Sequence, residues 1–239
     1  IGTFSSTGNF TVSGNIMSLL FGDNFINQTS LSGKNYAFYE LFKRCTNLTS
    51  IDDLVLPATT LADSCYGYMF SACGGLTSIP STLLPATTLA NHCYKSMFFN
   101  CRRLTSIPST LLPATTLANY CYDSMFYNCT GLTSIPSTLL PATTLADSCY
   151  YGMFSDCSKI TTAPNLMAGT LTKYSYAFMF QNCTKLNSIR MLATNISAQN
   201  CLRNWVSGVA PSGTFYKKSG VTIPSGTSGI PSGWTVVNE

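Results

Sequence analysis

The chain has 239 residues, 45% of them hydrophobic and only 9% charged, which excludes intrinsic disorder because disordered chains combine low hydrophobicity with high charge. The net charge of +4 comes from basic residues that are scattered singly or in pairs, which excludes an extended nucleic-acid groove. With a single His and two Glu, few residues can act as general acids or bases, so the composition favours a binding or structural protein over an enzyme.

The first 35 residues carry no repeat, and we interpret residues 1–35 as an N-terminal cap with a strand within residues 9–18. No stretch of the chain approaches the roughly 20 apolar residues of a membrane helix, so no transmembrane segment is expected. The sequence begins at Ile1 without a signal peptide, and we expect a processed protein or a piece of a longer one whose export signal is not visible here.

Residues 36–205 consist of about six copies of a repeat, mostly 28 residues long. Two series of cysteines mark the copies: Cys45, Cys73, Cys101, Cys129, Cys157 and Cys183 form one, and Cys65, Cys93, Cys121 and Cys149 form the other. The string LPATTLA occurs in four of the copies. One copy cannot bury its own apolar face, so the repeat predicts a solenoid in which neighbouring coils cover each other.

Each coil is predicted to contain two extended pieces and a helix. Residues 76–79 of the second copy read as a short β segment ended by a proline, and Thr-Thr-Leu-Ala reads as a second extended piece. An Asx residue follows in every full copy and predicts a helix N-cap, with a helix of about nine residues whose Cys65, Met69 and Cys73 form an apolar stripe. One phenylalanine per coil keeps its register and should stack in the core: Phe70, Phe98, Phe126, Phe154 and Phe180.

The last segment, residues 206–239, is interpreted as a C-terminal β cap. Gly, Pro and Ser separate two candidate strands there, at residues 214–218 and 234–237. Such covers are expected because an open solenoid end exposes core and unpaired strand edges.

The eleven cysteines are predicted to be mainly buried free thiols that pack as small hydrophobes. Cys65 and Cys73 lie too far apart along the predicted helix for a disulfide, and equivalent cysteines of adjacent coils point in parallel directions. Some bridging stays open as the alternative. A metal site is not expected, because the cysteines form parallel rows rather than convergent ligands. The only histidine, His92, follows an Asx residue at a variable position and is predicted to lie on the surface.

The pattern Leu-x-x-Ile, Leu-Pro, Leu, then Met-Phe-x-x-Cys-x-x-Leu resembles the BspA-like leucine-rich repeats of bacterial surface proteins, over roughly residues 36–205. The copies differ from that family in their 28-residue length and in the Met before the Phe. The resemblance implies an α/β solenoid: a right-handed leucine-rich-repeat coil stack with short β segments on one side, short helices on the other, and caps at both ends. It also implies a secreted or cell-surface protein, of the kind found in Bacteroidetes, that mediates adhesion or binding without catalysis or a cofactor.

Residues between the repeat's fixed positions supply the candidate binding site. Five aromatics at variable positions are candidate anchors: Tyr68, Phe99, Tyr120, Tyr127 and Tyr151. The alternative is that these rings only cover neighbouring coils. The β side would present a strip of Thr-Ser pairs that either binds a ligand or only solubilises the protein. We expect a monomer whose partner is a protein or glycan on a host or neighbouring bacterial surface; the alternative is a spacer with no ligand of its own.

Overall fold

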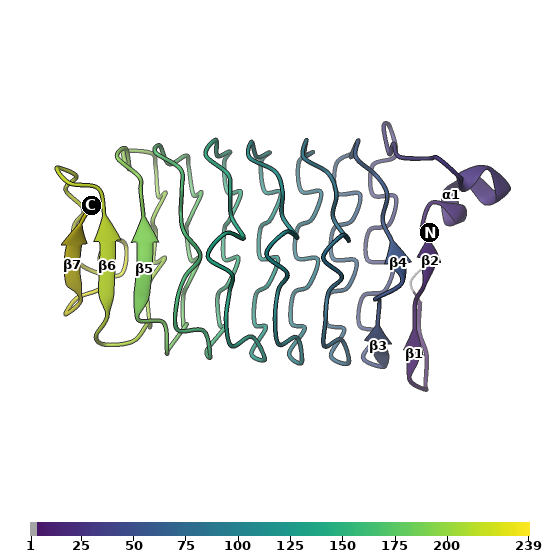
Figure 1. Cartoon of the computed structure of the whole chain (residues 1–239), viewed down its shortest axis with the longest axis horizontal. Coiled ribbons are helices and arrows are strands. Elements are labelled where there is room, and N and C mark those ends of the chain that lie inside the picture. The colour runs from purple at the N-terminus through teal and green to yellow at the C-terminus, as the bar shows by residue number, and fades with distance from the viewer. Residues whose placement is uncertain (1–3) are drawn as a thin grey trace.

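The computed structural model describes residues 4–239, which wind into coils stacked along one long axis (Figure 1). The first three residues of the predicted N-terminal cap lie outside the described residues. Regular elements are short and lie mainly at the two ends of the stack. They are β1 (Phe10–Thr11), β2 (Gly14–Asn15), α1 (Ser18–Phe21), the 3₁₀ helix η1 (Gly22–Phe25), β3 (Leu48–Ser50), β4 (Leu54–Val55), β5 (Ser188–Met191), β6 (Thr214–Lys217) and β7 (Thr235–Asn238). These strands pair in parallel, as β1 with β3, β2 with β4, and β5–β6–β7, because equivalent segments of successive coils run in the same direction.

The predicted strands of the middle coils are extended but form little regular ladder. Residues 76–79, 104–107 and 132–135 are joined by long backbone bonds, of 3.4 Å from the Thr105 N–H to the Thr77 carbonyl and 3.5 Å from the Thr133 N–H to the Thr105 carbonyl. The Thr-Thr-Leu-Ala segments are connected by isolated parallel bridges, including Thr60 with Thr88 and Thr116 with Thr144. A proline after each Ile removes a donor from the ladder, so we refer to this side as the extended face rather than a sheet.

The predicted helix in each coil is wrong. Residues 63–73 and their equivalents at 91–101, 119–129, 147–157 and 173–183 form a ribbon of consecutive turns, which we call the turn ribbon. Within it Ser64, Tyr68 and Ala72 have φ of +56°, +55° and +60°, values of the left-handed region that a right-handed helix does not contain. The equivalent positions of the following coils are left-handed in the same way.

Backbone N–H groups of the turn ribbon alternate between two kinds of acceptor. The Cys65 N–H donates to the Ala62 carbonyl three residues back, whereas the next N–H, from Tyr66, donates to Cys93 in the following coil. Half of the amides therefore close turns, and the other half form hydrogen bonds between adjacent coils. Together these bonds satisfy the buried backbone N–H groups without a helix. The left-handed residues recur every four positions, so an apolar stripe at i, i+4 and i+8 fits the ribbon as well as it fits a helix.

The predicted N-cap residues bridge the coils instead of capping helices. The Asn91 N–H donates to Asp63 Oδ1 at 3.2 Å, the Asn119 N–H to Asn91 Oδ1 at 3.2 Å, and the Asp147 N–H to Asn119 Oδ1 at 3.0 Å. We call this row the Asx ladder. It explains why an Asx residue recurs there even though no helix follows.

The predicted shared interior is confirmed by the phenylalanine column. Its rings are 0% exposed from Phe70 to Phe180, and successive centroids lie 5.5 to 5.9 Å apart with interplanar angles of 11° or less. A second buried column, which the sequence did not lead us to expect, consists of Tyr66, Tyr94, Tyr122, Tyr150 and Tyr176. Trp205 closes both columns at the C-terminal end, with its ring 6.4 Å from Tyr176 and 6.2 Å from Phe180.

All eleven cysteines are free and buried, which confirms the prediction of buried thiols. Several thiols donate to a carbonyl of the preceding coil, for example Cys73 Sγ to Phe42 at 3.0 Å and Cys101 Sγ to Phe70 at 3.2 Å. Burial raises the pKa of Cys101 to about 12, which keeps the thiol protonated as a donor.

The two ends follow their predictions to different degrees. β6 and β7 confirm the candidate strands at residues 214–218 and 234–237 to within a residue. The strand predicted within residues 9–18 is instead divided into β1 and β2, because Gly14 has φ +86°, and the chain turns into α1 at Ser18. In residues 4–239 no helix has the length and apolar character needed to cross a membrane.

Candidate functional site: an aromatic strip on the turn ribbons

Equivalent residues of the turn ribbons form two columns along the stack, which we name after their members in one coil; their large members border the surface, whereas Ser64, Ser148, Asp123 and Ala177 are buried. The position-64 column consists of Tyr36, Ser64, His92, Tyr120, Ser148, Tyr174 and Asn200. The N–H of each of the first six donates to a carbonyl of the following coil, and Asn200 is the equivalent residue of the next copy. The position-67 column is Tyr39, Gly67, Lys95, Asp123, Tyr151, Ala177 and Arg203. Together they make a strip rich in aromatic and charged residues.

A first hollow of about 230 Å³ opens in this strip around Ser64. Its walls are Tyr36, Tyr39, Tyr68, His92 and Lys95. The three tyrosine rings pack edge to face, with Tyr39 5.5 Å from both of its neighbours, so they support one another.

A second hollow of about 360 Å³ opens three coils further on, around Ser148. It is lined by Tyr120, Asp123, Ser148, Tyr151, Tyr174 and Arg203. In both hollows a serine of the position-64 column stands between aromatic residues of the coils before and after it. The short serine side chain leaves the space that the larger rings border.

His92 and Tyr120 form the wall between the two hollows. Their rings are stacked, with centroids 4.6 Å apart and an interplanar angle of 10°. Since one face of each ring is used in this stack, the other face of His92 is available to the first hollow and that of Tyr120 to the second. His92 is half-buried rather than fully on the surface as predicted, and burial, followed by the charge of Lys95, lowers its pKa below the usual value.

Charges on the strip are unevenly compensated. Lys95 Nζ lies 2.9 Å from Asp123 Oδ2, so a cation of the first hollow and an anion of the second neutralise each other. Burial alone would lower the pKa of Lys95, but the hydrogen bond and charge of Asp123 raise it overall. Arg203 packs over the Phe178 ring at 5.6 Å, and no acidic group within residues 4–239 lies at salt-bridge distance from it. Burial is the main cause that raises the pKa of Tyr151, which keeps its hydroxyl protonated.

The structure separates the five predicted site residues into three groups. Tyr68 lines the first hollow, and Tyr120 and Tyr151 line the second. Phe99 and Tyr127 line neither; they stack on each other at 4.8 Å as a pair at the edge of the ribbons. The nearby Asp156 carboxylate, as a hydrogen-bond acceptor, is the main cause that raises the pKa of Tyr127.

Sequence reasoning missed Tyr36, Tyr39, Tyr174 and Arg203, which complete the two hollows. The signal was present in the 28-residue register, since Ser64, His92, Tyr120 and Ser148 occupy one slot. Reading that slot as a freely variable helix position concealed that its members lie side by side and differ in size.

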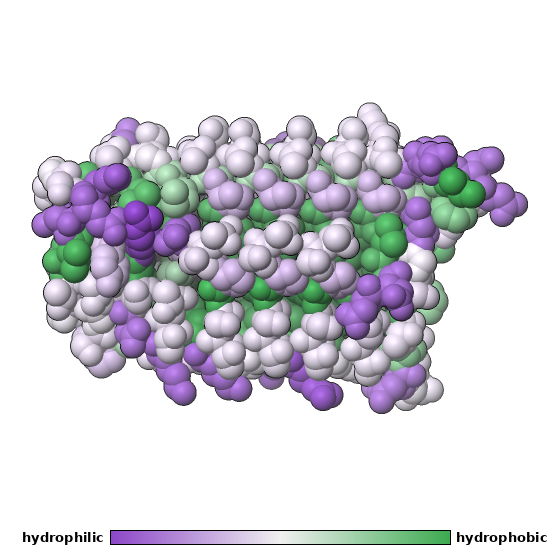
Figure 2. Space-filling model, in the orientation of Figure 1, coloured by the Kyte–Doolittle hydropathy of each residue, from purple (hydrophilic) through white to green (hydrophobic). Residues whose placement is uncertain are grey.

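The extended face offers no comparable chemistry. Figure 2 shows rows of near-neutral residues across the middle coils, with the strongly hydrophilic residues concentrated at the ends and along one edge. Thr105, Ser106, Thr133 and Ser134 are exposed there, as the predicted hydroxyl strip requires. Within residues 4–239, moreover, no group of three or more His, Cys, Asp or Glu side chains is placed to hold a metal ion.

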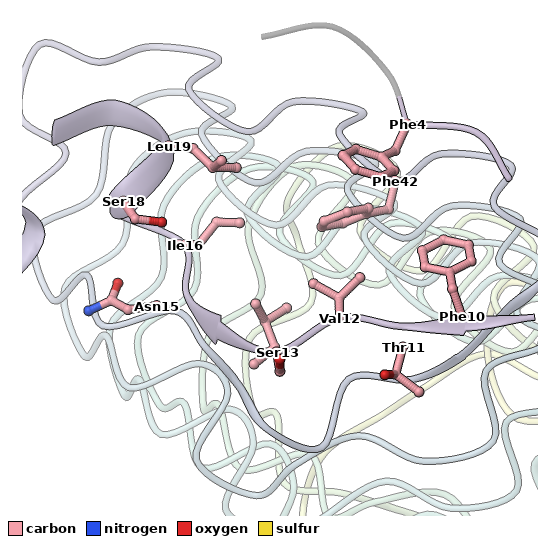
Figure 3. A pocket seen from close by; sticks show the side chains of 11 residues that line it. Phe4, Phe10, Thr11, Val12, Ser13, Asn15, Ile16, Ser18, Leu19 and Phe42 are labelled. Atoms are coloured by element: carbon pink, nitrogen blue, oxygen red, sulfur yellow. The ribbon is translucent and has the colours of Figure 1, made fainter. Parts of the chain in front are cut away.

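A further hollow of about 350 Å³ lies at the N-terminal end of the stack. Figure 3 shows Phe4 and Phe42 at its side, with their rings 5.7 Å apart and tilted by 50°, and Val12, Ile16 and Leu19 along it. Among residues 4–239 no charged residue lines it, and Phe42 continues directly into the phenylalanine column at 5.6 Å from Phe70. In the described part of the chain this end hollow therefore continues the hydrophobic core and brings together no polar groups of opposite charge.

Comparisons with known proteins add little to this geometry. No protein-family model matches the sequence, and no curated protein matches it either. One similar solved structure is a leucine-rich repeat protein from Bacteroides ovatus, with 14% sequence identity and a TM-score of 0.25. The similarity covers 76% of this chain and 66% of that chain, slightly under two thirds of its length. A likeness this weak does not define the fold, which rests on the hydrogen bonds and burial of the chain itself.

Proposed function

We propose that this chain is a noncatalytic binding protein, displayed at a bacterial cell surface as a BspA-like leucine-rich-repeat protein, that contacts a macromolecular partner through its turn ribbons. The observation that carries the proposal is the aromatic strip with its two hollows. Aromatic side chains provide contact area at low conformational cost and are enriched at binding sites. A strip that continues over several coils would spread the binding energy along the partner.

Sequence and structure agree in favouring the turn ribbons over the extended face. Copies two to four repeat the same Thr, Ser, Pro and Leu residues on the extended face, whereas the position-64 and position-67 columns change from coil to coil. Variation confined to one face is what specific recognition needs, because identical residues in every coil cannot distinguish one part of a partner from another.

A spacer that holds another domain away from the cell is the second candidate. The near-identity of copies two to four favours it, because a uniform stack needs no ligand. An array of glycans and extracellular-matrix proteins separates the two functions. A binder gives signals that Tyr120→Ser removes, while the extended-face variant Thr105→Ala retains them.

The outcomes of that array are distinct. Silence across the array supports the spacer, and a signal lost in Thr105→Ala but not in Tyr120→Ser moves the site to the extended face. Serine is the matched replacement at position 120 because Ser64 and Ser148 occupy the same left-handed slot. Labelling of intact, unpermeabilised cells with an antibody to the chain tests the surface location.

A further inference from the structure

The backbone of the turn ribbons is unavailable to a ligand. At the second hollow the Tyr120 N–H donates to Asp147, the Ser148 N–H to Lys173, and the Tyr151 N–H back to Ser148. An extended peptide therefore has no free edge on which to add a strand, the usual main-chain source of peptide affinity. Recognition at this hollow must come from side chains.

Those side chains are of a particular kind. Of the residues that the structure describes, the second hollow is lined by tyrosine rings, one serine, one carboxylate and one guanidinium, and by none that is aliphatic. Pockets for apolar peptide side chains or lipids are lined mainly by hydrophobic groups. Tyrosine ring faces with hydroxyl and charged groups around them instead suit a ligand whose ring has C–H groups on its faces and hydroxyls at its edge. A pyranose sugar is such a ligand.

The dimensions are consistent with such a ring. Tyr120 and Tyr174 flank Ser148 from the coils before and after, so their backbones are about 10 Å apart at the usual strand spacing. Van der Waals contacts of about 3.5–4 Å to each wall leave room for one puckered ring between them. The equivalent serine of the first hollow, Ser64, lies three coils away, or about 15 Å, at the same register.

The charge that faces the second hollow is positive. Asp123 is 5% exposed and is engaged by Lys95 and by the Ser124 hydroxyl at 2.7 Å, so it is not free to repel an anion. Arg203 is exposed, and Lys173 lies over the Tyr174 ring at 5.9 Å with no acidic group at salt-bridge distance in the described part of the chain. A guanidinium in this setting pairs best with a carboxylate, which it can hold by two parallel hydrogen bonds.

We propose that the second hollow binds a hexuronate residue of an acidic polysaccharide, with the carboxylate on Arg203 and the sugar ring between Tyr120 and Tyr174, and that the polymer runs along the strip toward the first hollow. The two hollows at one register favour a polymer over a single terminal sugar. This inference rests on the proposed binding function and names its ligand class.

The test is calorimetric titration of the full chain with a galacturonate tetramer and with its fully methyl-esterified counterpart, which keeps the rings and removes the charge. We expect the acid to bind at least tenfold more tightly than the ester, since hydrogen bonds to charged groups are the stronger ones. Arg203→Gln should abolish that preference, while Arg103→Gln, an equal change of net charge at an exposed arginine outside both hollows, should leave it intact.

A second variant tests the hollow itself. Ser148→Tyr should fill it and remove binding without loss of stability, because Tyr120 occupies the equivalent slot with the same φ of +55°. The inference is overturned if the ester binds as well as the acid, if Ser148→Tyr or Arg203→Gln binds like the native chain, or if sialyllactose, a single terminal acidic sugar, matches the tetramer. If the tetramer does not bind but another ligand on the array gives a signal that Tyr120→Ser removes, the inference is overturned and the proposed binding function stands.

Discussion

Glycine substitution distinguishes the turn ribbon from a helix at two matched serines. Ser96 has φ +52° and is 2% exposed, whereas Ser71, in the preceding coil, is 3% exposed and is not left-handed. A non-glycine residue in the left-handed region costs about 1–2 kcal/mol, and glycine costs about 0.5–1 kcal/mol more conformational entropy than alanine on folding. Ser96→Gly should therefore stabilise the protein by about 0.5–1 kcal/mol, and Ser71→Gly should destabilise it by a similar amount. The native Gly152, with φ +55°, already occupies the slot equivalent to Ser96.

Urea unfolding, followed by the fluorescence of the two buried tryptophans, Trp205 and Trp234, and by far-UV circular dichroism, measures both changes. With a slope near 3 kcal/mol per molar urea, each change shifts the midpoint by about 0.2–0.3 M, in opposite directions. Loss of the serine hydroxyl is common to both variants and cancels in the comparison. Equal destabilisation by the two changes, which a helix would give, would refute the turn ribbon.

The other predictions concern the core, the Asx ladder, the thiols and pH. Phe126→Ala should cost about 3–5 kcal/mol in urea unfolding, and Phe126→Leu clearly less; equal costs would argue against a filled phenylalanine column. Asn119→Ala should cost about 1 kcal/mol while Asn119→Asp keeps the acceptor for Asp147, and equal losses would contradict the ladder. Without reductant, all eleven thiols should react with a thiol reagent after denaturation and very few before it, and a much lower denatured count would indicate disulfides. Because burial lowers the folded pKa of His92 below its unfolded value near 6.5, stability should fall as the pH drops below about 6.5, and His92→Gln should lose part of this dependence.

The architecture could be predicted from the sequence because it depends on repetition. Apolar residues that recur at the same place in every copy must share one interior, and the fully buried rings of Phe98 and Phe126 bear this out. The burial of the cysteines could be predicted for the same reason, since small apolar side chains that recur in parallel rows fit the shared interior. Both inferences required only the spacing between copies and not the conformation within a copy.

The conformation within a copy could not be predicted in the same way. Cys65, Met69 and Cys73 are spaced by four residues, which a helix of 3.6 residues per turn and a ribbon of four residues per double turn accommodate equally well over so short a stretch. The Asx residue before them was equally ambiguous, because it can cap a helix or bridge to the next coil. Tyrosine at the left-handed position 68 contradicts ordinary residue preferences, and its backbone is held there by the bond from its N–H to Lys95 of the following coil.

The turn ribbon also explains how a repeat can keep its core and vary its surface. Its N–H groups alternate between closing turns and joining coils, and none of these bonds uses a side chain of the position-64 column. That column accepts Ser, His, Tyr and Asn at φ values between +54° and +59°, so the backbone there does not depend on the residue. The extended face, by contrast, repeats its residues because Leu and Ile from it reach the interior. Recognition chemistry can therefore change from coil to coil only on the ribbons, and each exchange of a large side chain for serine opens a hollow at a defined place along the stack.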